Sequence, residues 1–321
     1  MSLWKLRLSL LGTLALIIGL STLFFTVILA IAGVSIIFLP FIVVIFNIIQ
    51  WLIAPYLIDS MYRVKEVKPQ DDPQLYEIVD RLSRKSKIKR PKLMKANIPI
   101  PNAFAYSSPL TGSKVAVTDG LLQNLDSEEV EAVIGHELGH LKHRDVQVMM
   151  FVSILPAIFY FIGYSMLLSS MFGRRDSRDN GGAAIIGIAS ILLYWVLTLF
   201  TLYLSRIREY YADRHSVSIV DDGSRKLSEG LAKIVNSTNI AKKKMRTKGG
   251  NANSFKALFI SDPDRSEVDA EALSQLRIGM GDRRLVEEVL RKRITTFDKI
   301  MEIFSTHPNI VKRLRALQEL S

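Results

Sequence analysis

The sequence contains no cysteine among its 321 residues. This absence excludes disulfide bonds, thiol catalysis and zinc sites built from cysteine, and it leaves the redox compartment undetermined. Internal repeats and nucleic-acid recognition motifs are also missing, although the net charge is +11. We therefore expect no nucleic acid partner, and we interpret the positive charge as complementary to anionic lipid headgroups.

Charged residues are missing from three long stretches. The first, residues 8–58, covers 51 positions. As one helix it would be about 76 Å long, against a bilayer core of about 30 Å, so it is expected to cross twice, with a break near Gly33. The charge-free stretches 146–173 and 180–205 predict two further spans. The alternative is that these two are buried core helices, which would leave two spans.

The basic residues near the ends of these stretches indicate which segments face the cytoplasm. Lysine and arginine lie before the first predicted span, between the second and third, and after the fourth. We therefore expect residues 61–145 and 206–321 to be cytoplasmic. The loop 174–179, RRDSRD, conflicts with this topology, because four spans would place its three arginines outside.

Residues 136–140 read HELGH, a pattern typical of zinc hydrolases. The preceding residues favour a helix, since Asp126 and Ser127 are N-cap candidates and Glu129 completes a capping box with Asp126. This helix is expected to run without a break into the third span. The metal site would then lie at the cytoplasmic end of a membrane helix.

Positions four apart project from one face of a helix, so His136 and His140 are expected to bind a single zinc ion. Zinc lowers the pKa of its water from about 15.7 to about 7. Glu137 would accept the proton of that water as it attacks a peptide carbonyl, and would pass it to the leaving amine. The alternative interpretation is a pair of solvated helix histidines.

A site with two histidines needs a third protein ligand and an open position for water. Residues 206–213 read RIREYYAD, which places Glu209 and Asp213 four apart on one helical face. We assign Glu209 to the metal and expect Asp213 to accept the outer N–H of a ligand histidine. Taken alone, the pair is equally compatible with an ordinary charged helix face.

Two short alternating runs, residues 102–106 and 114–118, flank the turn-forming sequence SSPLTGS and predict a β-hairpin. In a peptidase, an exposed strand edge can pair with an extended substrate. A purely structural hairpin is the alternative. A helix is expected near residues 73–87, and the Gly- and Lys-rich residues 242–253 are expected to form a mobile loop.

The predicted fold class is mainly α, with multi-pass membrane helices continuous with a zincin-like cytoplasmic domain that carries a small β-hairpin. Residues 1–60 are expected to form a transmembrane hairpin of two spans, and residues 146–205 a second one. Residues 61–145 would hold the β-hairpin and the HELGH helix. Residues 206–321 would form a cytoplasmic helical part with the third zinc ligand.

In combination, these motifs resemble those of the HtpX membrane metalloproteases, whose wider clan includes the eukaryotic CAAX prenyl protease. The resemblance rests on HELGH followed by LKHRD, on REYYAD after a membrane hairpin, on NAFA with its partner VTDGLL, and on the late STHP. It covers nearly the whole chain, in the same order of spans and motifs. Residues 242–285 and their flanks have no recognisable match.

The resemblance implies a zinc endopeptidase in a prokaryotic plasma membrane, with its catalytic domain in the cytoplasm, that degrades damaged or misassembled membrane proteins. It implies one zinc ion held by His136, His140 and Glu209, with Glu137 as the general base. Asp213 matches the last residue of a family motif, which supports its role beside a ligand histidine.

Three further residues enter through the resemblance. Asn102 matches the asparagine of the family's strand motif, which implies a position on the substrate side. His307 and Arg313 match a late His-Pro motif with an arginine six residues on, in a family where that histidine lies near the scissile carbonyl. A positioned donor there would stabilise the oxyanion. Alternatively, His307 is a helix N-terminal residue ahead of Pro308.

The leading hypothesis is therefore a membrane-embedded zinc protease of broad specificity, acting on polypeptides in protein quality control and stress response. One alternative is a processing peptidase selective for one substrate, such as a prenylated C-terminus. Another is a non-catalytic membrane adaptor, which would have no need to retain HELGH together with Glu209 and Asp213. Zinc is the expected ion, although the same ligands could bind cobalt or manganese.

Overall fold

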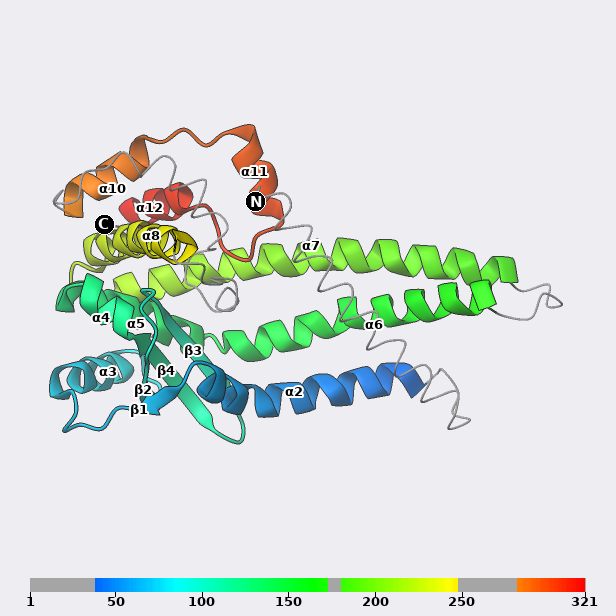
Figure 1. Ribbon diagram of the computed structural model, residues 1–321, viewed down its shortest axis with the longest axis horizontal. Helices are drawn as coiled ribbons and strands as arrows, with labels where there is room; N and C mark the ends of the chain where they lie inside the picture. The colour runs from blue at the N-terminus through cyan, green and yellow to red at the C-terminus, as the bar shows by residue number, and fades with distance from the viewer. Residues whose placement is uncertain (1–37, 173–179, 248–281, 321) are drawn as a thin grey trace. The chain divides into compact units, whose positions relative to one another are not determined.

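The computed structural model describes residues 38–172, 180–247 and 282–320 (Figure 1). The helices are α2 (Leu39–Met61), α3 (Pro73–Lys85), α4 (Asp119–Asn124), α5 (Ser127–Lys142), α6 (Asp145–Phe172), α7 (Asn180–Ile219), α8 (Gly223–Thr247), α10 (Asp282–Arg291), α11 (Thr296–Ile303) and α12 (Ile310–Gln318). The strands are β1 (Val64–Glu66), β2 (Lys92–Ala96), β3 (Ala103–Ser108) and β4 (Gly112–Thr118). The predicted fold class, mainly helical with a small sheet, is confirmed.

The chain divides into two compact units. The membrane unit falls within residues 1–51 and 148–201, and the sheet-containing unit falls within residues 52–147 and 202–321. All the residues that form the site described below belong to the sheet-containing unit.

Three of the described helices are long and apolar enough to cross a membrane, over Phe41–Met61, Asp145–Met171 and Gly182–Ile219. They correspond to the second, third and fourth predicted spans. The first predicted span lies in residues 1–37, outside the described residues, and the loop 174–179 also lies outside them. The number of passes therefore stays a prediction.

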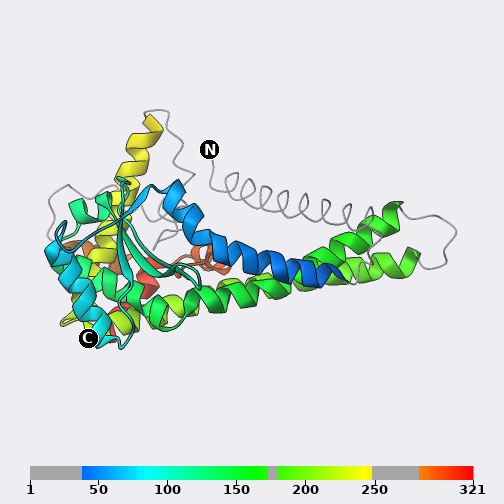
Figure 2. The same cartoon turned by 90° about the horizontal axis from the view of Figure 1, so that it is seen from below.

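Within the membrane unit, α6 and α7 run side by side (Figures 1 and 2). Two glycines let their backbones approach closely. A Cβ on Gly163 would lie 2.9 Å from the carbonyl oxygen of Gly187, and a Cβ on Gly187 would lie 3.1 Å from that of Gly163. Small residues at such contacts are typical of helix packing in membranes, where close van der Waals contact drives association.

The sheet has the strand order β1-β2-β4-β3, so β3 forms one edge. The β3–β4 pair is antiparallel with Ala103 opposite Val117, which confirms the predicted hairpin. Gly112 begins β4 with a φ of 73°, a left-handed conformation that glycine adopts without steric cost. β2 pairs with β4 in parallel, and α3 lies between β1 and β2 in the chain and confirms the helix expected near residues 73–87.

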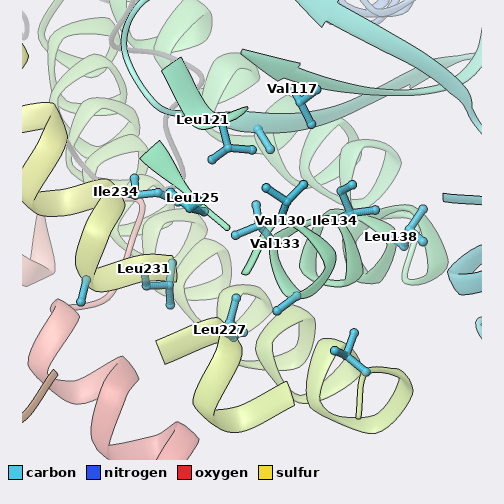
Figure 3. Packing of buried hydrophobic residues seen from close by; sticks show 14 of the residues in the cluster. Val117, Leu121, Leu125, Val130, Val133, Ile134, Leu138, Leu227, Leu231 and Ile234 are labelled. Atoms are coloured by element: carbon cyan, nitrogen blue, oxygen red, sulfur yellow. The ribbon is translucent and has the colours of Figure 1, made fainter. Parts of the chain in front are cut away.

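The core of the sheet-containing unit lies around α5 (Figure 3). Val130, Ile134 and Leu138 project from α5 into this core and are at most 4% exposed. Residues from the sheet and from α3, α4, α8, α10 and α12 also belong to the cluster, and those labelled in Figure 3 outside α5 are Val117, Leu121, Leu125, Leu227, Leu231 and Ile234. Burying these side chains fixes the position of α5, and with it the direction in which its polar residues point.

The structure corrects two predictions about helix boundaries. α5 ends at Lys142 and α6 begins at Asp145, so the HELGH helix does not run unbroken into the third span. The chain turns at Arg144, whose φ of 55° is left-handed and incompatible with a continuing helix. In addition, α8 continues to Thr247, so residues 242–247 of the expected loop are helical, and residues 248–253 lie outside the described part.

A candidate metal centre

The HELGH motif lies in the C-terminal half of α5, so it is helical as predicted. The helix starts with the expected capping box, in which the Asp126 N–H donates to Glu129 Oε2 at 2.9 Å. His136 and His140 lie one turn apart with their ring planes at 89° and their Nε2 atoms 3.1 Å from each other. The two imidazoles therefore face one common point.

Helix α7 brings Glu209 to the same point. Glu209 Oε2 lies 3.6 Å from His136 Nε2, and Glu209 Oε1 lies 3.5 Å from His140 Nε2. This close packing of α7 on α5 requires the glycine of the motif, because a Cβ on Gly139 would lie 2.9 Å from the Cα of Ala212. Cβ atoms essentially never come so close to backbone, so Gly139 determines how near Glu209 can lie to the histidines.

The ligand distances fit one tetrahedral ion. Nitrogen and oxygen ligands at about 2.0–2.1 Å from zinc in tetrahedral geometry would lie about 3.3 Å from each other. The separations are 3.1 Å between the two Nε2 atoms, 3.6 Å from His136 Nε2 to Glu209 Oε2 and 3.5 Å from His140 Nε2 to Glu209 Oε1. These residues form the one group of possible metal ligands that stands out in the described part of the chain.

The outer nitrogen of each histidine faces a carboxylate. His136 Nδ1 lies 2.9 Å from Asp213 Oδ1, and His140 Nδ1 lies 2.6 Å from Asp145 Oδ2. When each Nδ1 carries the hydrogen and donates it to its carboxylate, both Nε2 lone pairs are directed inward. Two lone pairs and the Glu209 carboxylate would then repel one another unless a cation lay between them. The site therefore fits a metal cation.

Asp145 was not among the residues predicted from the sequence. It is 3% exposed, and its Oδ2 also accepts a hydrogen bond from Arg208 Nη2 at 2.9 Å. The left-handed turn at Arg144 ends α5 and allows the carboxylate of Asp145 to return to the ring of His140. The signal in the sequence was a carboxylate five residues after the second histidine of the motif.

Arg313, from α12, holds the two carboxylates of α7. Its Nε donates to Asp213 Oδ2 at 2.9 Å, its Nη2 donates to Asp213 Oδ1 at 2.5 Å, and its Nη1 lies 3.1 Å from Glu209 Oε2. The side chain is 2% exposed. Burial alone would lower the pKa of Arg313, but Asp213 and Glu209 outweigh it and raise the pKa above its usual range.

Glu137 is 3% exposed and accepts a hydrogen bond from the backbone N–H of Ala105 in the edge strand β3. Burial raises the pKa of Glu137, although His140 and His136 act in the opposite direction. Burial also lowers the pKa of His136, but hydrogen bonds to Asp213 and Glu209 outweigh it and raise that pKa to about 10. A proton on His136 would therefore have to leave before the nitrogen could bind a metal.

The other two residues predicted for the site are His307 and Asn102. His307 Nε2 lies 3.7 Å from Glu209 Oε1, so the structure brings this histidine to the ligand group. Asn102 is 5% exposed at the start of the hairpin, where its carbonyl accepts from the Thr118 N–H and its own N–H donates to Thr118 Oγ1. The backbone of Asn102 is thus held by β4.

A fold of membrane-spanning helices with a His-His-Glu centre defines a membrane metallopeptidase. The model of peptidase family M48 matches residues 69–321. The chain belongs to this family, and the resemblance to the HtpX proteases is confirmed by curated relatives.

The "Protease HtpX homolog" of Thermoplasma acidophilum is 35% identical over 281 residues, which cover 86% of this chain and 83% of the relative. "Protease HtpX homolog 2" of Sulfurisphaera tokodaii is 37% identical over 286 residues, covering 87% and 84%. The fold is similar to the crystal structure of S. mikatae Ste24p, with a TM-score of 0.53 and 17% identity. That match covers 98% of this chain and 66% of the other.

Proposed function

We propose that this chain is a zinc endopeptidase that hydrolyses peptide bonds of damaged or misfolded membrane proteins at the cytoplasmic face of a prokaryotic plasma membrane. The observation that carries the proposal is the convergence of His136 Nε2, His140 Nε2 and Glu209 on one point, with both Nδ1 atoms held by carboxylates. This is the arrangement that fixes histidines as metal ligands.

His136, His140 and Glu209 would hold the ion. When bound, zinc would polarise a substrate carbonyl and lower the pKa of a water molecule from about 15.7 to about 7. Asp213 and Asp145 would fix the ring orientation of the two histidines, because a carboxylate oxygen of each lies 2.9 Å or less from the Nδ1 on the side away from the centre. Partners of this kind typically contribute 10- to 100-fold to metal affinity or activity.

Glu137 is the general base of the proposed reaction. Its carboxylate lies one position from His136 on the buried side of α5, where burial raises its pKa and so increases its affinity for a proton. It would take the proton of the attacking water and then transfer it to the nitrogen of the leaving amine. The hydrogen bond from the Ala105 N–H holds the carboxylate in place between the helix and the edge strand.

The edge of β3 is the proposed binding surface for the peptide backbone. Asn102 bonds to Thr118 of β4, so the alternation of an antiparallel pair turns the N–H and C=O groups of residues 103, 105 and 107 away from β4, where the Ala105 N–H donates to Glu137. An extended peptide that pairs with this edge would be held through its main chain with little sequence preference. Because Ala105 contacts Glu137, such a peptide would lie beside the base.

His307 and Arg313 have different proposed roles. His307 would donate a hydrogen bond to the oxygen that gains negative charge when the carbonyl is attacked, an interaction that typically contributes a few kcal/mol; its Nε2 atom 3.7 Å from Glu209 Oε1 supports this role. Arg313 would be a positioning residue, because its buried guanidinium contacts the carboxylates of Glu209 and Asp213.

The membrane setting supports substrates embedded in the bilayer. Asp145 begins α6, whose apolar stretch starts at the next residue, and Glu209 follows the charge-free stretch 180–205 of α7 by four residues. At about 1.5 Å per residue, Glu209 lies about 6 Å along the helix from the end of that stretch.

The test is proteolysis by the purified full-length chain in detergent. We expect it to cleave unfolded casein, to lose activity with a chelator and to regain it with zinc. Glu137→Gln should retain zinc and lose activity, whereas the surface variant Glu128→Gln, on the same helix and 62% exposed at its side chain, should keep both. Cleavage by Glu137→Gln at the parental rate would refute the assignment of the base.

A further inference from the structure

The short helix α11 exposes an apolar face. Phe297, Ile300 and Ile303 are 54%, 50% and 45% exposed, and Phe304, which follows the helix, is 53% exposed. At 100° per residue these four positions fall within an arc of about 120°. Glu302 lies on the opposite side, Met301 lies at the flank of the arc, and both are buried. The helix is therefore amphipathic, but its apolar side faces outward.

This orientation is held by specific contacts. The helix begins with a capping box between Thr295 and Asp298. On the inner side, Glu302 Oε1 accepts the N–H of Asn309 at 3.1 Å, and Glu302 Oε2 lies 2.5 Å from Lys312 Nζ. Rotating α11 to bury its apolar residues would break both contacts of Glu302, so the outward apolar face is a fixed feature of the fold.

The end of α11 is tied to α7 at the boundary of its apolar stretch. Arg206 is the first charged residue after the charge-free residues 180–205, and its Nη1 donates to the carbonyls of Ile303 at 3.1 Å and Ser305 at 2.8 Å. Its guanidinium also lies 5.7 Å from the ring centre of Tyr203. Tyrosine and arginine are the residues that mark the ends of membrane spans.

We propose that the outward face of α11, formed by Phe297, Ile300, Ile303 and Phe304, docks onto the surface of the bilayer that α7 crosses. An amphipathic helix with large apolar side chains lies in the interface with that face in the acyl boundary. The tie through Arg206 puts the end of the helix at the level where the apolar stretch of α7 ends. The partner is thus a lipid surface continuous with the one around the membrane helices.

The charges beside the helix fit anionic headgroups. Arg291, Lys292 and Arg293 come shortly before α11, and Lys299 is exposed next to the apolar arc. Basic side chains beside an amphipathic helix attract anionic lipids and let the apolar face insert. The same chemistry on a protein partner would not require this position at the end of a membrane span.

Docking has a consequence for the site, which rests on the proposed function. The segment that carries His307 is held between two ties to α11 and α7, because Arg206 binds the Ser305 carbonyl and Glu302 binds the Asn309 N–H. Ser305 Oγ also donates to the His307 carbonyl at 2.9 Å. A bilayer that fixes α11 therefore also fixes the segment that places His307 beside Glu209.

The absence of cysteine from the chain provides a direct test. Ile300→Cys gives a unique attachment point for a nitroxide label, and Gln123→Cys, exposed on α4, gives a matched control. The full chain would be reconstituted in nanodiscs that contain anionic lipid. We expect the label at 300 to be severalfold more accessible to oxygen, relative to a water-soluble nickel complex, than the label at 123.

Two outcomes would overturn the docking. One is equal relative accessibility at 300 and 123. The other is dipolar broadening between labels at 300 on different molecules, which would assign the face to contact between two copies of the chain. The depth of the label in the bilayer is measured without any proteolysis. A label embedded in lipid on a chain that cleaves no substrate would therefore support docking and, separately, contradict the proposed function.

The link to His307 needs a second measurement. The double variant Ile300→Ser, Phe304→Ser should lower casein cleavage in anionic nanodiscs severalfold more than in detergent. An equal loss in both media would show that the substitutions act on folding alone and would overturn the link.

Discussion

Arg313→Met tests whether the carboxylates behind the metal ligands depend on one buried cation. Methionine keeps the length of the side chain but removes the guanidinium, which makes two contacts with Asp213 and one with Glu209. Asp213 and Glu209 are 2% and 6% exposed, so water cannot replace the lost contacts without a rearrangement. The variant therefore leaves two buried carboxylates without this counter-charge.

The expected loss can be estimated from comparable sites. Removing one partner of a buried ion pair costs about 3–5 kcal/mol, because the remaining charge stays buried. For a unit of about 150–250 residues, 1 kcal/mol corresponds to about 2–4 °C in Tm, so the metal-free variant should melt about 6–20 °C lower. Excess zinc should reduce the difference, since the ion supplies positive charge next to Glu209.

Thermal unfolding of the purified chain in detergent measures this effect. The matched control is Arg315→Met on the same helix, because Arg315 is exposed and, within the described part of the chain, donates to the carbonyls of Leu290 and Lys292 at 3.4 Å. Its change should stay within about 0.5 kcal/mol. A Tm of Arg313→Met within 2 °C of that control would refute the assigned role of the ion pair.

Three further predictions concern the centre itself. Asp145→Asn should weaken zinc binding about 10- to 100-fold, because a carboxylate would no longer hold the ring of His140. Competition with a chromophoric chelator measures this affinity, and an unchanged value would contradict the role of Asp145. In the metal-free chain, burial lowers the pKa of His136, but hydrogen bonds to Asp213 and Glu209 outweigh burial and raise this pKa to about 10. Zinc uptake at pH 8 should therefore release a proton, and the affinity for zinc should rise with pH below 10. Calorimetry in two buffers of different ionisation enthalpy should detect that proton, and identical heats would argue against it. Gly139→Ala should destabilise the fold by about 1–3 kcal/mol, because the added Cβ would meet the backbone of Ala212. An unchanged melting temperature would show that α5 and α7 can separate without cost.

Local patterns predicted the parts of the site that depend on helix geometry. The spacing of His136 and His140, and that of Glu209 and Asp213, places each pair on one face of a helix, and the capping box at Asp126 marks where α5 starts. The hairpin was equally readable, because its turn residues and alternation lie within 17 positions of each other. These signals act over one or two turns of chain and do not need the tertiary structure.

The break between α5 and α6 could not be read from the sequence in the same way. Arg144 adopts a left-handed φ of 55° without being glycine or asparagine, the residues that usually signal such a turn. Tertiary contacts favour the break, because it lets Asp145 contact both His140 and Arg208. The local sequence preferences around Arg144 do not indicate these contacts.

Long-range pairing was also beyond local patterns. Arg313 and Asp213 are 100 residues apart in the chain, and only the resemblance singled out both. The parallel pairing of β2 with β4 depends on the chain between them folding back, which no hairpin signal describes. The exposed apolar face of α11 follows from the contacts of Glu302 and Arg206, since the periodicity of the helix alone would predict that this face is buried.

Zinc stoichiometry tests the central claim most directly. We expect about one zinc ion per chain in the purified parental protein and in Glu137→Gln. Glu209→Ala should lose most of its zinc, and the surface control Glu128→Ala should retain it. Full zinc occupancy in Glu209→Ala, with casein cleavage retained, would contradict the claim that His136, His140 and Glu209 together hold the catalytic metal.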